Sequence, residues 1–198
     1  MLRTARVNGT AISKEAVQFE LERLVRFYTA HGFSADEIRK SLPELADKAL
    51  DQAIGAKLLL DRASQLDVPV SAAEIDAEVS KVIDQVGGFD NYRKALAAQG
   101  VTEASFRKEL EKGARVNKLV AQACAGVDEP SEADVAAFFE AHRADYPGRT
   151  LVDVHDQVKD LIRHDARGRA VEAFVAELKA SAEIEIVEDE KDHGGTHD

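Results

Sequence analysis

The chain has 198 residues, of which 44% are hydrophobic and 32% charged, and its formal net charge is −11. This composition is typical of a chain with a packed core rather than of a disordered one. The acidic excess argues against nucleic-acid binding, which depends on clustered lysine and arginine.

The covalent and targeting signals are few. The single cysteine, Cys124, excludes an internal disulfide, and no apolar run approaches the ~20 residues needed to span a bilayer. The N-terminal sequence MLRTARVNG lacks the apolar segment of a secretory signal. We therefore expect a cytoplasmic location for the chain as it stands, and a periplasmic one if an export peptide was removed.

Helical periodicity dominates the chain, and most of the predicted helices begin at a serine or threonine that can cap them. Eight helices are predicted. In chain order they are Ser13 to His31, a short helix that begins at Ser34, Pro43 to about Gln65, Ser71 to Val86, a short helix around Tyr92 and Leu96, Thr102 to near Gly126, Ser131 through Phe139, and Thr150 to about Ala180. Gly113 is expected to weaken one of these helices and Gly168 to bend or interrupt another.

Strand signals occur only near the two ends of the chain. ARVNGTAIS contains an Asn8-Gly9 turn signal, and AEIEIVE alternates isoleucine with glutamate. Because a lone strand needs a partner, the two segments are predicted to pair with each other. The expected fold is mainly α, with a small two-stranded sheet that joins the N- and C-terminal strands and a disordered acidic tail at 188–198.

The order of these elements resembles that of a known family. Three successive segments are similar to the N-terminal chaperone domain of SurA- and PrsA-type folding factors. They are VNGTAIS, ALDQAIGAKLLLDRASQLDVPVSAAEIDAEVSKVI and GGFDNYRKALAAQGVTEASFRKELEKGARVNKLV. VDVHDQVKDLIRHDARGRAVEAFVAELKASAEIEIVE resembles the C-terminal helix and strand that complete that domain. The resemblance implies one chaperone domain over residues 1–187, completed by residues 149–187.

Most members of that family carry a parvulin-type prolyl isomerase module at the position where this chain has only PGRT, residues 147–150. A parvulin domain needs on the order of a hundred residues, which this junction does not provide. The resemblance therefore implies a chaperone core without an isomerase module. We expect no enzymatic activity and assign no catalytic residue.

Aromatic residues near helix ends are the candidate binding surface. As a group, these residues are expected to line an apolar groove that receives unfolded polypeptide. The alternative for each single residue is that it is an ordinary member of the hydrophobic core. These candidate residues are Phe27, Tyr28, Phe33, Phe89, Tyr92, Phe138 and Phe139.

Other chemistry finds little support. His193 and His197 are spaced for a loose metal site, but a flexible tail opposes binding, so no metal is expected. His155 and His164 are expected at the surface, and Cys124 is expected to be a small buried residue. The two glycines of QVGGFDNY have no phosphate-binding lysine, so no nucleotide or other cofactor is expected.

The leading hypothesis is therefore an ATP-independent holdase that binds unfolded or partly folded polypeptides. The alternative is a dedicated assembly or scaffold partner of one protein, acting as a homodimer formed by arm exchange. Breadth of binding distinguishes the two.

Overall fold

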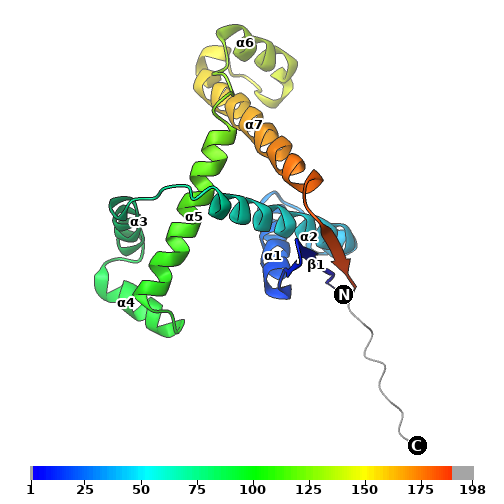
Figure 1. Ribbon diagram of the computed structural model, residues 1–198. Helices are drawn as coiled ribbons and strands as arrows, with labels where there is room; N and C mark the ends of the chain where they lie inside the picture. Colours follow the sequence, from blue (N-terminus) through cyan, green and yellow to red (C-terminus); the bar gives the residue numbers. More distant parts are fainter. Residues whose placement is uncertain (1, 189–198) are drawn as a thin grey trace, which may run out of the picture. The chain divides into compact units, whose positions relative to one another are not determined.

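The computed structural model describes residues 2–188, which form seven α-helices, one 3-10 helix and three strands (Figure 1). The strands are β1 (Thr4–Val7), β2 (Thr10–Ala11) and β3 (Ile184–Val187). The helices are α1 (Lys14–Ala30), α2 (Ala35–Gln65), α3 (Ala72–Gln85), α4 (Phe89–Ala98), α5 (Glu103–Ala123), α6 (Glu132–Ala141), η1 (Arg143–Asp145) and α7 (Leu151–Ala180). The predicted mainly helical fold is confirmed.

The strands form one antiparallel sheet in the order β2-β1-β3. Asn8 and Gly9 turn the chain between β1 and β2 with φ of 49° and 76°, the positive values that a tight hairpin turn requires. β1 pairs with β3 from Thr4↔Val187 to Val7↔Ile184. The predicted pairing of the two chain ends is therefore confirmed, and β2 adds a third strand.

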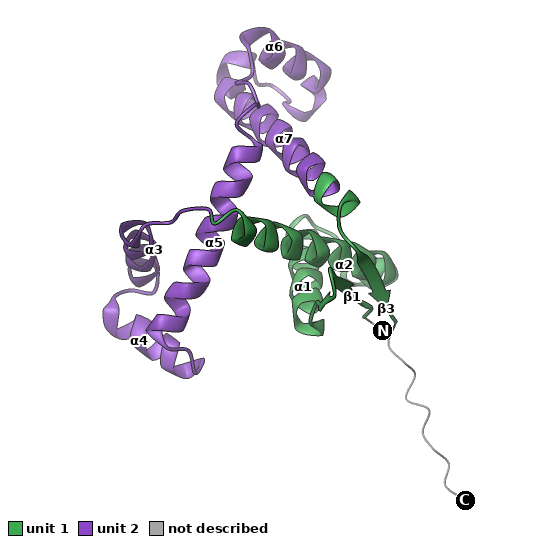
Figure 2. Cartoon of the chain, in the orientation of Figure 1, with its two compact units in different colours: residues 1–67, 177–198 green, residues 68–176 purple. Residues whose placement is uncertain are grey.

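The described residues divide into two compact units (Figure 2). Unit 1 holds residues 2–67 and 177–188, and unit 2 holds residues 68–176. In this division only the last turn of α7 and β3 join unit 1. The reason is that the start of α7 buries Val154 and Val158 in a core with α6, inside unit 2. The single domain over residues 1–187, completed by residues 149–187, remains a prediction. Most of the predicted acidic tail, residues 189–198, lies outside the described residues.

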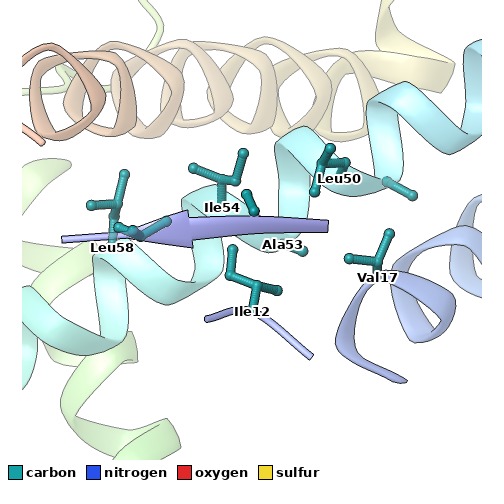
Figure 3. Close-up of a cluster of buried hydrophobic side chains, with 9 residues drawn as sticks. Ile12, Val17, Leu50, Ala53, Ile54 and Leu58 are labelled. Atoms are coloured by element: carbon teal, nitrogen blue, oxygen red, sulfur yellow. The ribbon is translucent and has the colours of Figure 1, made fainter. Parts of the chain in front are cut away.

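The core of unit 1 is built where α1 and α2 pack with the N-terminal strands (Figure 3). The buried residues are small and aliphatic: Ala5, Val7, Ile12, Val17, Ala49, Leu50, Ala53, Ile54 and Leu58. Leu178 and Ile184, from the C-terminal part of the chain, pack against this cluster. Unit 1 thus needs both ends of the chain to close its apolar core.

Helix α2 differs from its prediction. A capping box between Ser34 and Glu37 starts it as expected, but the helix then continues through Pro43 to Gln65. The prediction of two separate helices was wrong. Proline removes the hydrogen bond to the carbonyl of Arg39 and crowds that carbonyl with its ring. Strong helix formers on both sides, with the buried Leu45 and Ala49, keep the helix continuous.

Unit 2 has two small cores. One joins α3, α4 and α5 around Ile75, Val79 and Tyr92, and the other joins α6 to the start of α7. Four of its helices, α3, α5, α6 and α7, begin at the predicted caps Ser71, Thr102, Ser131 and Thr150. α5 and α7 run without interruption through Gly113 and Gly168, so the expected interruption at Gly168 is not seen.

Candidate functional site

The structure separates the seven predicted surface aromatics by exposure. Phe27, Phe33 and Phe89 are exposed, with 54%, 47% and 52% of their surface accessible. Tyr28 and Phe138 are partly buried. Tyr92 and Phe139 are only 1% and 2% exposed. The burial of the last two corrects their assignment to a surface, because each fills a hydrophobic core.

An aromatic cluster closes the C-terminal end of α1. It consists of Phe27, Tyr28, His31 and Phe33, and we call it the α1 aromatic end. The ring centroids of Phe27 and His31 lie 4.0 Å apart, and Tyr28 meets Phe27 and Phe33 edge-to-face at 5.5 and 5.1 Å. His31 Nδ1 donates to the carbonyl of Phe27 at 2.7 Å. These contacts hold exposed rings in one arrangement, which lowers the entropy that a ligand must remove on binding.

A small recess of about 70 Å³ adjoins this cluster between the end of α1 and the first half of α2. Its apolar lining is Tyr28, Phe33, Ile38 and Leu45, and its polar lining is Glu37, Ser41, Glu44 and Lys48. The recess has the size of one small side chain and lies entirely within unit 1.

Phe19 is an exposed aromatic that the sequence analysis missed. It is 58% exposed and borders a second, more open recess of about 480 Å³. Leu2, Lys14, Glu15, Gln18 and Glu22 complete the lining. The available signal was helical phase, because Phe19 falls outside the stripe of Val17, Leu21 and Leu24 that faces the core.

In unit 2, Phe89 and Tyr92 lie on the same short helix but in different surroundings. The Tyr92 ring packs edge-to-face on Phe106 at 5.7 Å, while the Phe89 ring stays outside. The buried Tyr92 hydroxyl has no hydrogen-bond partner among the described residues. Burial raises the pKa of that phenol, with a further contribution from Glu103.

The aromatic residues of α6 serve the second core of unit 2. Phe139 packs on Tyr146 at 5.7 Å, and the Arg143 guanidinium lies 5.7 Å from the Phe139 ring centre. Phe138 stacks on His142 at 4.0 Å. Only Phe138 keeps part of its ring accessible.

The remaining candidate groups were the histidines and Cys124. Within residues 2–188, no group of three or more His, Cys, Asp or Glu side chains is placed to hold a metal ion. His193 and His197 lie outside those residues. Cys124 is buried, as expected, with its Sγ 3.7 Å from the carbonyl of Arg167. His155 is 31% exposed and bonds Glu132 through Nε2 at 2.7 Å. No helix in the described part of the chain has the length and hydropathy to cross a bilayer.

Residues 3–120 match the family model of the SurA-like N-terminal domain, so the chain belongs to that family. The family resemblance predicted from the sequence is confirmed.

Two particular proteins are similar to the chain. The chain superimposes on a solved structure with a TM-score of 0.58 at 14% sequence identity. That structure comes from a description of the virulence factor PEB4 and the periplasmic protein Cj1289 as two structurally related SurA-like chaperones of Campylobacter jejuni. The match covers 94% of this chain and 99% of that one, which shows a shared fold. The putative peptidyl-prolyl cis-trans isomerase NifM of Azotobacter chroococcum is 25% identical over 155 residues, 71% of this chain. The match spans about half, 53%, of the length of that relative.

Proposed function

We propose that the protein is an ATP-independent holdase that binds non-native polypeptides through exposed aromatic residues of unit 1. The observation that carries the proposal is the exposure of Phe19, Phe27 and Phe33 along α1 and at its end. Membership of the SurA-like N-terminal domain family supports a chaperone-type role for such a surface.

The physics of the surface suits many clients. Each apolar side chain that a client buries there contributes roughly 25 cal/mol per Å² before ordering costs are subtracted. Contacts of this kind tolerate differences of shape, so unrelated unfolded segments can be accepted. The net charge of −11 favours basic or neutral clients over acidic ones.

The test is aggregation of two unrelated, chemically unfolded proteins, followed by light scattering without ATP. The chain should suppress scattering of both at near-stoichiometric ratios. A variant with Phe19, Phe27 and Phe33 all changed to Ser should lose most of this effect while its circular dichroism is unchanged.

The matched control replaces three exposed apolar residues of unit 2 by Ser: Val86, Val152 and Leu161. It removes comparable apolar surface and should suppress aggregation as the wild type does. Equal losses in the two triple variants would contradict a site on unit 1.

The proposal includes the absence of prolyl isomerase activity. It is tested in a refolding assay limited by proline isomerisation, with a known parvulin as the positive control. Acceleration by this chain would favour the activity named for its NifM relative and would replace the holdase proposal with an enzymatic one.

A second candidate is a dedicated assembly or scaffold partner that forms a homodimer. The favouring observation is that β3, from the distant C-terminal end, completes the sheet of unit 1 by pairing with β1. Such an arm can exchange between two copies of a chain. Light scattering across a range of concentrations checks the dimer, because a constant mass of 21.6 kDa would reject it. Binding to one protein but not to unrelated unfolded clients would favour this candidate over the holdase.

A further inference from the structure

The outer side of β3 is an open sheet edge. β3 is the last strand in the order β2-β1-β3, so it has a strand partner only on its β1 side within residues 2–188. The backbone N–H of Asn8 donates to the carbonyl of Glu183 at 2.8 Å, so the backbone groups of Glu183 point toward β1. Alternate residues of an antiparallel strand bond to opposite sides. The backbone groups of Ile184 and Ile186 therefore point to the open edge.

The two faces of β3 differ in chemistry. Ile184 and Ile186 pair with Val7 and Ala5, both buried, so these four residues share the face toward the core. Ile186 is nevertheless 46% exposed. The strand therefore presents apolar side chains on its inner face next to unpaired backbone groups.

The other face of the edge is acidic. Glu183 and Glu185 both project there, both are exposed, and no cation within residues 2–188 lies within 4 Å of either carboxylate. Arg6, which faces Glu185 from β1, donates instead to the carbonyl of Gly9 at 3.3 Å. The carboxylates of Glu183 and Glu185 are thus available to a partner.

From this edge we infer that unit 1 binds an extended polypeptide as a fourth, antiparallel strand beside β3. The occupant alternates basic with aliphatic residues, since side chains opposite Glu183 and Glu185 share the acidic face and those opposite Ile184 and Ile186 share the apolar one. The inference rests on the proposed function in that the ligand is an unfolded chain, but its surface is separate from the α1 aromatic end.

A second copy of the chain is a poorer occupant. If two copies paired through β3 in the antiparallel register centred on Glu185, the Glu185 carboxylate of one copy would lie directly opposite the Glu185 carboxylate of the other. Like charges in directly opposite positions destabilise strand pairing. The other sheet edge, β2, is only two residues long and has no carboxylate. Charge therefore favours a basic partner over a second copy in that register, and length favours β3 over β2.

The probe is an eight-residue peptide that alternates Lys with Val, titrated into the ¹⁵N-labelled full chain. Its binding should shift the amide resonances of Ile184 and Ile186 more than those of Phe19 and Phe27. The same peptide with Glu in place of Lys should bind more weakly. No binding of the Lys peptide, or shifts centred on Phe19 and Phe27, would overturn the inference.

Backbone methylation separates strand addition from side-chain docking. In the antiparallel arrangement the Val residues of the peptide lie opposite Ile184 and Ile186, so their N–H groups bond to β3. N-methylation of the Val residues should weaken binding about tenfold or more, since at least two hydrogen bonds are lost. N-methylation of the Lys residues should have little effect, and equal effects of the two would reject strand addition.

Variants of the chain complete the test. Changing Glu183 and Glu185 to Gln should weaken binding of the Lys peptide about three- to tenfold, as expected for two exposed charge pairs. Glu172→Lys, which changes the net charge by the same amount on an exposed residue of α7, should not. If these substitutions leave peptide binding unchanged while the wild type still suppresses aggregation, the edge inference fails and the holdase proposal survives.

Discussion

Two five-residue segments, FYTAH at 27–31 and FFEAH at 138–142, end helices α1 and α6 with the same local device. In each, the histidine ring lies 4.0 Å from the phenylalanine four residues earlier. In each, histidine Nδ1 donates to the carbonyl of that phenylalanine, at 2.7 Å in α1 and 2.9 Å in α6. The local sequence thus ends both helices in the same way.

The surroundings of the two segments differ. Phe139, the second aromatic of the α6 segment, is buried by Tyr146, Val154 and Val158. In the α1 aromatic end, the nearby Phe27 and Phe33 both stay about half exposed. The comparison teaches that the motif determines the helix end, whereas the chain that follows decides whether the rings become core or surface.

The largest expected effect is a difference in how much an alanine substitution in each of the two segments changes the free energy of unfolding. Phe139→Ala should destabilise unit 2 by about 3–5 kcal/mol, because it leaves a cavity in a small core. Phe27→Ala should change the stability of unit 1 by less than about 1 kcal/mol, because the ring is already half in water. Urea unfolding, with amide hydrogen exchange to locate the loss, measures both. Equal losses would show that the exposed ring at the end of α1 is structural.

A smaller effect, of opposite sign, is expected at the third aromatic site, Tyr92. Its buried hydroxyl has no partner among the described residues, so Tyr92→Phe should stabilise unit 2 by about 1 kcal/mol. Absorbance titration of the wild type should show a tyrosine pKa above the usual value of 10.0, from Tyr92, and this titration should disappear in the variant. Tyr28→Phe is the control, and a loss of stability in Tyr92→Phe would mean that the hydroxyl is hydrogen-bonded in solution.

Local features of the fold followed from the sequence. The caps Ser13, Ser34, Ser71, Thr102 and Ser131 all accept the predicted backbone hydrogen bond from within their own first turn. Such contacts span three residues, so spacing alone specifies them. The pairing of β1 with β3 followed from a different rule, that two lone strands need each other.

Features that depend on residues far apart in the sequence could not be predicted from the sequence. Tyr92 is buried and Phe89 exposed because Phe106, on the next helix, covers only one of them. Pro43 looked like a helix start, yet the packing of later residues keeps α2 continuous. Periodicity gives the face of a helix, but not what will cover it. The division between core and surface aromatics was therefore beyond the sequence.

The smallest expected effect concerns what holds α6 against α7. Glu132, in the first turn of α6, accepts from His155 Nε2 at 2.7 Å and lies 3.7 Å from Lys159 Nζ. His155 also contacts Asp156 at 3.0 Å. The hydrogen bond to Asp156, and then that to Glu132, raise the pKa of His155 above its usual 6.5. The His155 hydrogen bond, followed by its charge, lowers the pKa of Glu132 below 4.5.

These opposite shifts define a pH window. The contribution of His155 is complete below pH 6.5 and is lost as the pH rises through its raised pKa, whereas that of Glu132 is present above pH 4.5 and is lost as the pH falls. His155→Gln should therefore lower the melting temperature most near pH 5.5, and less at pH 8. The difference should be small, because solvent screens these exposed charges. His164→Gln, at an exposed position of the same helix, is the control for replacing a histidine of α7. A pH-independent effect of His155→Gln would mean that the imidazole acts by packing alone, without a contribution from its charge.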